Sequence, residues 1–109
     1  MKENSMARPL TDPSLAGFEQ KAEEAAAMLK ALGNEKRLMI LCKLLENGEM
    51  SVMSLNGHVG LSQSALSQHL AKMRDEKIVG TRRDAQQIFY HVADPRVREI
   101  LSTLKSVYC

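Results

Sequence analysis

The fold is indicated most strongly by residues 61–70, which read Leu61-Ser62-Gln63-Ser64-Ala65-Leu66-Ser67-Gln68-His69-Leu70. The Ser62 hydroxyl suits the position before a helix, because it can accept a hydrogen bond from a backbone amide of the first turn. Apolar residues at helical spacing then predict a helix over residues 63–76, with a buried face formed by Leu66, Leu70 and Met73. The opposite face is small and polar and consists of Ser64, Gln68 and Ala71, flanked by Ser67 and Lys72.

Three further helices are predicted on the N-terminal side of this stretch. An apolar stripe from Phe18 to Leu32 predicts the first helix, which Gly33 ends. Asn34 is a suitable cap for a second helix over residues 35–46. The shared face of this second helix is formed by Leu38, Leu41, Cys42 and Leu45. Ser51 can cap a short third helix over residues 52–59, which a turn at residues 60–62 separates from the helix over 63–76.

The periodicity changes after residue 76. Residues 77–83 and 87–92 are rich in strand formers, and residues 84–86 between them predict a β-hairpin. Asp94-Pro95 is typical of a helix cap followed by proline at the first helical position. The last helix carries a single apolar stripe, formed by Val97, Ile100, Leu101, Leu104, Val107 and Tyr108.

Together these elements predict a mainly α protein with a small β-hairpin. Their order is helix, helix, short helix, turn, helix, hairpin and helix, which is the order of a winged helix-turn-helix domain. A chain of 109 residues has room for one core, which we place in residues 18–109, preceded by a flexible arm of residues 1–17. Residues 1–9 lack the apolar region of a secretory signal, and no apolar stretch is long enough to cross a membrane. We therefore expect a cytoplasmic, nucleoid-associated location.

The distribution of charge is more informative than its sum. The net charge of +2 is too small to indicate a nucleic-acid partner by itself. Residues 72–98, however, hold seven Lys or Arg against four Asp or Glu, whereas the rest of the chain sums to −1. The positive charge is therefore concentrated on the predicted recognition helix, the hairpin and the start of the last helix, where DNA would be met.

The residues predicted to contact DNA have different roles. Ser62 and Gln63 lie at a helix N-terminus, where backbone amides attract a phosphate, and Gln68 can pair with the edge of an adenine. Arg82 and Arg83 on the hairpin can reach phosphates or the minor groove. The full set is Ser62, Gln63, Ser64, Ser67, Gln68, His69, Lys72, Arg82, Arg83 and Gln86. Taken singly, each could equally be solvated surface, and His69, at the edge of the buried face, could pack instead.

Residues 61–70, with Met73-Arg74 and Ile88-Phe89-Tyr90, resemble the ArsR/SmtB family of winged-helix repressors. Residues 29–38 resemble the stretch that leads into the family's second helix, so the likeness spans roughly residues 19–109. The resemblance implies a homodimer, joined through the first and last helices, that binds an imperfect inverted repeat in double-stranded promoter DNA. It also implies an inducer that lowers the affinity for DNA.

Metal sensing is the best-known activity of the family, but the matching positions lack the ligands. One family site needs two cysteines in the third-helix region, where Ser51 and Met53 stand in this chain. A second site uses Asp and His on the last helix, which has no histidine here, and His58, His69 and His91 lack ligand spacing. A metal-responsive repressor therefore remains an alternative, and neither a metal site nor a cofactor is expected.

The chain has two cysteines, Cys42 and Cys109, which are too few for a disulfide-rich secreted scaffold. From position alone, Cys42 could be a small core residue on the apolar face and Cys109 a stray terminal thiol. Both positions match the thiol-switch branch of the family, which comprises HlyU-, BigR- and SqrR-type regulators. The resemblance implies that a reactive sulfur species or an oxidant bridges Cys42 and Cys109 by a disulfide or polysulfide. The bridged repressor would then release promoter DNA.

Other functional classes remain open at this point. A HlyU-like derepressor or activator of virulence genes would present the same DNA-binding face as a repressor. A dimerising adaptor would use the same fold without DNA. A thiol oxidoreductase is disfavoured, because the chain has no Cys-x-x-Cys pair and no glycine-rich phosphate loop. We therefore expect a regulator and not an enzyme.

Overall fold

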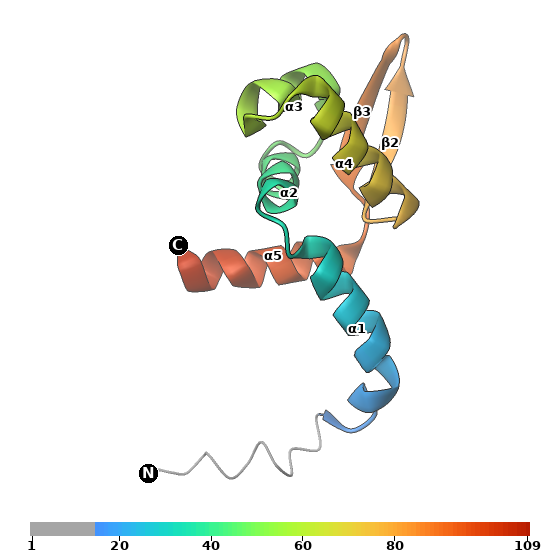
Figure 1. Cartoon of the computed structure of the whole chain (residues 1–109), viewed down its shortest axis with the longest axis vertical. Helices are drawn as coiled ribbons and strands as arrows, with labels where there is room; N and C mark the ends of the chain where they lie inside the picture. The colour runs from blue at the N-terminus through green and yellow to red at the C-terminus, as the bar shows by residue number, and fades with distance from the viewer. Residues whose placement is uncertain (1–14) are drawn as a thin grey trace. The chain divides into compact units, whose positions relative to one another are not determined.

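The computed structural model of the chain describes residues 15–109 (Figure 1). Contacts within the chain separate residues 1–31 from residues 32–109, and the division falls at the end of helix α1 (Phe18–Leu32). The predicted flexible arm, residues 1–17, lies largely outside the described residues. Among the described helices, none is both long enough and apolar enough to cross a membrane.

Residues 32–109 form four further helices and three strands. They are α2 (Glu35–Asn47), β1 (Met50–Ser51), α3 (Val52–Val59), α4 (Gln63–Asp75), β2 (Val79–Asp84), β3 (Gln87–Val92) and α5 (Pro95–Tyr108). The predicted order of a winged helix-turn-helix domain is confirmed. In Figure 1 the hairpin of β2 and β3 projects past α3 and α4 at the end of this unit that lies opposite α5.

The helices after α1 begin at the capping residues that the sequence predicts. The side chains of Asn34, Ser51, Ser62 and Asp94 each accept a hydrogen bond from a backbone amide in the first turn of α2, α3, α4 and α5. Such a bond satisfies an amide that has no partner within the helix, and it therefore favours one starting residue over its neighbours. As a result, a short turn over residues 60–62 separates α3 from α4.

The sheet contains a third strand that the sequence analysis did not predict. Strand β1 pairs antiparallel with β3, with Met50 opposite Tyr90 and Ser51 opposite Phe89, so the strand order is β1-β3-β2. Two residues are too few to show the alternation of apolar and polar side chains that identifies a strand. Because α3 starts directly after β1, this edge strand joins the hairpin to the helix-turn-helix.

Both ends of β2 differ from the prediction. The chain must turn from helix into strand, and it does so at Lys77, which has a φ of 63°, so β2 begins at Val79 rather than at residue 77. At the tip, Asp84 belongs to the strand and pairs with Gln87. The turn is therefore made by two residues, 85–86, and not by the predicted three.

The core surrounds α2, which contacts both α3 and β3. Ile40, Leu41 and Leu44 of α2 have no exposed surface. The predicted buried face of α4 is confirmed, because Leu66, Leu70 and Met73 are also fully buried. The packing of α4 thus leaves its opposite face to solvent.

The predicted apolar face of α2 is wrong in one respect that bears on function. Cys42 is exposed, whereas Ile40 and Leu44, which that face omitted, are buried. Successive helical residues are about 100° apart, so Cys42 and Ile40 lie on opposite sides of Leu41. The contacts of α2 with α3 and the sheet cover the Ile40 side, and the thiol stays accessible.

The predicted stripes of α1 and α5 are only partly buried. Helix α5 buries Val97 and Leu101, but Val107 and Tyr108 near its end are 69% and 81% exposed. On α1, Phe18 and Leu29 are 53% and 61% exposed. Each helix therefore carries large apolar side chains at the surface, a feature typical of interaction sites when they are contiguous.

The cap of α5 yields a test of stability. The Asp94 carboxylate accepts from the Arg96 amide at 2.9 Å and from the Arg96 guanidinium at 3.1 and 2.8 Å. These bonds hold the pKa of Asp94 below its ordinary value of 3.8, so the carboxylate stabilises the fold above that pH. This contribution is lost as the pH falls through the folded-state pKa.

We expect Asp94→Ala to lower the free energy of unfolding by about 1 kcal/mol at pH 7, because α5 loses its cap. Asp94→Asn keeps a capping oxygen without the charge, so its difference from the parent should shrink below pH 4, approximately. Urea unfolding from pH 7 to pH 3 measures both. A constant difference between the parent and Asp94→Asn across this range would contradict the assignment.

A candidate nucleic-acid interface and a cysteine pair

The turn between α3 and α4 is held by three local features. The Asn56 amide donates from Nδ2 to the Leu61 carbonyl at 2.7 Å. Gly60 ends α3 with a φ of 61°, a left-handed conformation that glycine adopts without steric cost. Ser62 Oγ accepts from the Ala65 amide at 3.1 Å. These features determine the direction in which α4 leaves the turn.

The polar face of α4 is exposed, as a recognition helix requires. The predicted contact residues on this face are all exposed, and they are Ser62, Gln63, Ser64, Ser67, Gln68 and Lys72. Ser64 and Ser67 are small, so the helix backbone can approach the floor of a major groove. Gln68 carries an amide that can donate to and accept from one adenine.

His69 differs from these residues because it faces α2. It is half-buried, and its Nδ1 accepts a hydrogen bond from Arg37 Nε at 3.3 Å. Arg37 also forms an ion pair with Glu76, with 3.5 Å between Nη1 and Oε1. This geometry supports the packing role that the sequence left open for His69, and it connects α2 to the second half of α4.

The two arginines of the hairpin point to opposite faces of the sheet, because side chains alternate along a strand. Arg82 forms a bidentate ion pair with Glu49, with Nε donating to Oε1 at 3.1 Å, and its guanidinium lies 4.8 Å from the centre of the Phe89 ring. Arg83 is exposed and makes no ion pair with the described part of the chain. Gln86 is exposed in the turn at the tip. The two arginines, for which the sequence predicts the same role, therefore differ in their partners and in the sheet face on which they lie.

Internal pairing removes part of the positive charge that the sequence placed in this region. Arg82 is paired with Glu49, and Arg96 is paired with Asp94. The cations of this region without an ion pair to any residue in the range 15–109 are Lys72, Arg74, Lys77, Arg83 and Arg98, and Arg98 donates a hydrogen bond to the Val92 carbonyl. The first four lie on α4, on the turn after it and on β2, and Arg98 lies on α5. The positive surface therefore follows the recognition helix and one side of the wing.

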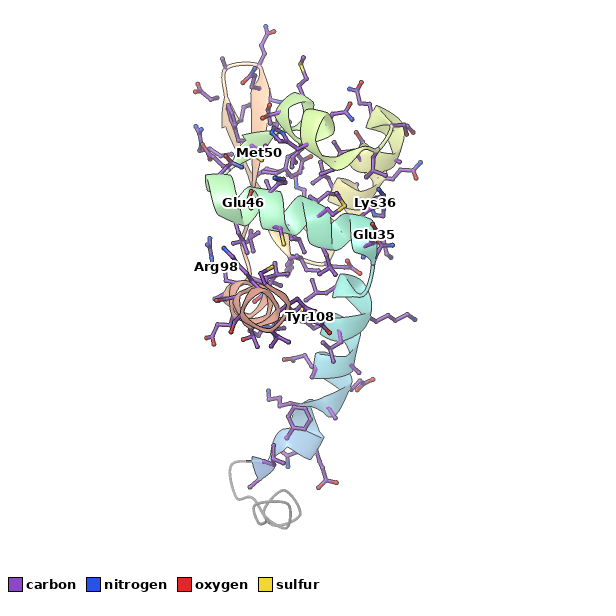
Figure 2. All side chains as sticks on the ribbon, turned by 90° about the vertical axis from the view of Figure 1, so that its left-hand side faces the viewer. Glu35, Lys36, Glu46, Met50, Arg98 and Tyr108 are labelled. Carbon is purple, nitrogen blue, oxygen red and sulfur yellow. The ribbon has the colours of Figure 1, made fainter. Side chains whose placement is uncertain are left out.

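Helix α5 brings Cys109 within electrostatic reach of Cys42. Both thiols are exposed and unbridged, and Cys109 is near enough for its charge to act on Cys42. Both figures show α5 passing across α2, and Figure 2 labels Glu46 on α2 and Tyr108 on α5. Partial burial, then the charges of Glu46 and Cys109, raise the pKa of the Cys42 thiol, and Lys105 and Lys43 oppose this shift. Cys42 is therefore a thiol rather than a thiolate at neutral pH.

No group of three or more His, Cys, Asp or Glu side chains suited to a metal ion occurs within residues 15–109. Ser51, at one family ligand position, caps α3 by accepting from the Ser54 amide at 3.2 Å. His58 bonds to the Ser54 carbonyl of its own helix at 2.8 Å. These side chains have structural partners in the helix-turn-helix.

Three residues that position the interface were not among the sequence predictions. Asn56 holds the turn, Arg37 holds α4, and Glu49 holds Arg82. Asn56 lies five residues before the carbonyl it binds, so this contact is local in sequence. The partners of Arg37 and Glu49 are 32 and 33 residues away, so no local pattern indicates them.

Known proteins of the same architecture are similar to this chain over most of its length. The family described as "Bacterial regulatory protein, arsR family" matches residues 34–81. The chain is 50% identical over 95 residues to the HTH-type transcriptional regulator YgaV of Escherichia coli K12, covering 87% of this chain and 96% of the relative. It is 45% identical over 96 residues to the transcriptional activator HlyU of Vibrio cholerae, covering 88% of each.

A solved structure gives the same result. The transcriptional repressor BigR from Xylella fastidiosa superposes with a TM-score of 0.79 at 39% identity, over 84% of this chain and 93% of that chain. Because this match covers 84% of the chain, the likeness extends beyond the helix-turn-helix. The chain therefore belongs to the ArsR family of DNA-binding transcriptional regulators and is not an enzyme.

Proposed function

We propose that this regulator is a repressor that releases promoter DNA when Cys42 and Cys109 become bridged. The observation that carries the proposal is that two exposed thiols, 67 residues apart in sequence, lie within electrostatic reach of each other. A thiol that is both exposed and close to a second thiol can be oxidised to a bridge, whereas a buried core cysteine is inert. The inducer would be a reactive sulfur species or an oxidant.

The bridge can form with a persulfide, R–S–SH, as the only co-reactant. The Cys109 thiolate attacks the outer sulfur, which yields Cys109–S–SH and releases R–S⁻. Cys42 then loses its proton to water and attacks the Cys109 sulfur, which expels HS⁻ and leaves a disulfide. The two cysteines lose two electrons, and the persulfide is reduced to a thiol and hydrogen sulfide. We assign the first attack to Cys109 because the raised pKa of Cys42 disfavours its thiolate.

A bridge at Cys42 would act on the helix that orients α4. Arg37 lies five residues before Cys42 on α2 and contacts both His69 and Glu76. Joining the end of α5 to α2 would therefore change the position of the recognition helix. A dimer reads two half-sites about 34–36 Å apart, so a small shift of each α4 lowers the affinity for both together.

We propose that two copies of the chain form a homodimer, which contacts DNA through α4 and the wing. Exposed apolar side chains on α1 and α5, among them Phe18, Leu29, Val107 and Tyr108, supply surface for the contact between copies. Two-fold symmetry presents two α4 helices to an imperfect inverted repeat. Such a protein would act in the cytoplasm, on nucleoid DNA.

Activation or derepression is the second candidate function. It is favoured by the description of HlyU as a transcriptional activator. The DNA contacts would be unchanged, because activation depends on what else occupies the promoter. Transcription from a reporter promoter, with purified polymerase alone, distinguishes the two: a repressor lowers it, and a derepressor leaves it unchanged until a competing DNA-binding protein is added.

We expect persulfide to weaken promoter binding of the parent by roughly tenfold or more, a typical coupling between two sites. Cys42→Ser and Cys109→Ser should keep the affinity of the reduced parent and lose this response, because neither can form the bridge. Gel shifts on the region upstream of the chain's own coding sequence measure binding, and mass spectrometry measures the loss of two hydrogens. Release of DNA from either variant at the parental persulfide concentration would refute the switch.

Gln68→Ala tests direct reading of a base by α4. If Gln68 pairs with one adenine, the change should cost about 1–3 kcal/mol of binding and relax the preference at one operator position. Binding to a panel of single-base operator variants measures this, with Gln20→Ala on α1 as the control. An unchanged base preference would remove Gln68 from the reading residues.

Arg83→Ala tests the wing as a phosphate contact. Arg83 is exposed, makes no ion pair within residues 15–109, and lies on the same sheet face as Val79, the face that packs on the helices. Its loss should weaken binding to specific and non-specific DNA alike. It should also make the slope of log K against the logarithm of the salt concentration shallower by about 0.9. Lys30→Ala on α1 removes the same charge elsewhere and should leave the slope unchanged. Parental slopes for Arg83→Ala would exclude the contact.

A further inference from the structure

A cluster of three side chains crosses the outer face of the wing sheet. Arg82 of β2 lies directly opposite Phe89 of β3, and its guanidinium is 4.8 Å from the centre of that ring. The guanidinium then reaches Glu49, the residue before β1, with two parallel hydrogen bonds. Planar, bidentate pairs of this kind fix geometry as well as charge.

The cluster joins the wing to the helix-turn-helix. Strand β1 has only two residues, and α3 begins immediately after it at Val52. Few backbone hydrogen bonds can hold so short a strand on β3. The bond from Arg82 to Glu49 adds a connection between the wing and the segment from which α3 starts.

While this ion pair exists, the Glu49 carboxylate offsets the positive charge of Arg82, and the guanidinium is not available to bind a DNA phosphate. Its hydrogen bonds lower the pKa of Glu49 below the usual range, so the carboxylate is ionised at neutral pH. The Arg82 side chain reaches toward the base of the hairpin, since Glu49 adjoins the Met50–Tyr90 pair and not the tip. Arg83, on the opposite face and nearer the tip, has no such partner among the described residues.

We infer that Glu49 is a positioning residue for DNA binding: it holds Arg82 on Phe89 and thereby sets the wing relative to the helix-turn-helix. Arg82 then acts as a structural connection, and Arg83 meets the phosphate. The inference rests on the proposed DNA-binding face but not on the thiol switch, because it concerns the reduced protein.

The test compares Glu49→Gln, Arg82→Gln, the double variant and Arg83→Ala, all with excess reductant. The probes are the chain's own upstream DNA and a shuffled duplex of the same length. Glu49→Gln and Arg82→Gln should each weaken binding to the upstream DNA by roughly threefold to fivefold, in line with the loss of a half-exposed ion pair. The double variant should be no weaker than either single variant, and the salt slope should stay parental.

Two further measurements separate positioning from general damage. The melting temperature should fall by no more than a few degrees, as expected for the loss of one exposed ion pair. The exchanged pair Glu49→Arg with Arg82→Glu should recover part of the affinity. Glu46→Gln removes an ion-paired carboxylate from α2, away from the wing, and should bind as the parent does.

Removing a negative charge should, on simple electrostatic grounds, tighten DNA binding. Tighter binding by Glu49→Gln, a reduced salt slope for Arg82→Gln, or additive losses in the double variant would each overturn the inference. A parental result for Arg83→Ala would instead overturn the proposed DNA-binding face. A weakened Arg83→Ala beside a parental Glu49→Gln would overturn the positioning role alone.

Discussion

Burial of one face of α4 is the constraint on which the rest of the structure depends. Leu66, Leu70 and Met73 have no exposed surface, and full burial stabilises such side chains by roughly 1.5–3 kcal/mol each. A helix that buries one face must expose the other, so the small polar residues between Ser64 and Lys72 face solvent. The recognition surface is therefore a consequence of core packing, and the caps at Ser51 and Ser62 determine where that surface begins.

The same packing gives α2 a central place between the core and the two candidate functional sites. Its buried side carries Ile40, Leu41 and Leu44, and Arg37 extends from it to α4. Its outer side carries Cys42, where α5 ends. Interiors packed at crystal density transmit displacement rather than absorb it. A covalent change at the outer side of α2 would thus reach α4 through contacts that already exist.

Most of the fold could be predicted because its signals are local. Capping residues, helical periodicity and Asp94-Pro95 act within about four residues, and the helices lie within two residues of their predicted bounds. The errors occur where local signals end. Strand β1 depends on pairing with β3. Strand β2 begins later than the composition of residues 77–83 indicates, because Lys77 has a left-handed conformation. Cys42 was misplaced because α2 has apolar residues on more than one side, and only its neighbours decide which side is covered.

The sequence by itself determined the order of elements, the small polar face of α4 and the concentration of positive charge after residue 72. Each of these follows from residue types at short spacing. Only the tertiary structure decided which charges are paired and which side chains lie near each other. Arg37 and His69 are 32 residues apart, Arg82 and Glu49 are 33, and the cysteines are 67. Neighbouring arginines diverge because strand side chains alternate, and distant residues converge because helices and strands pack, which no local pattern encodes.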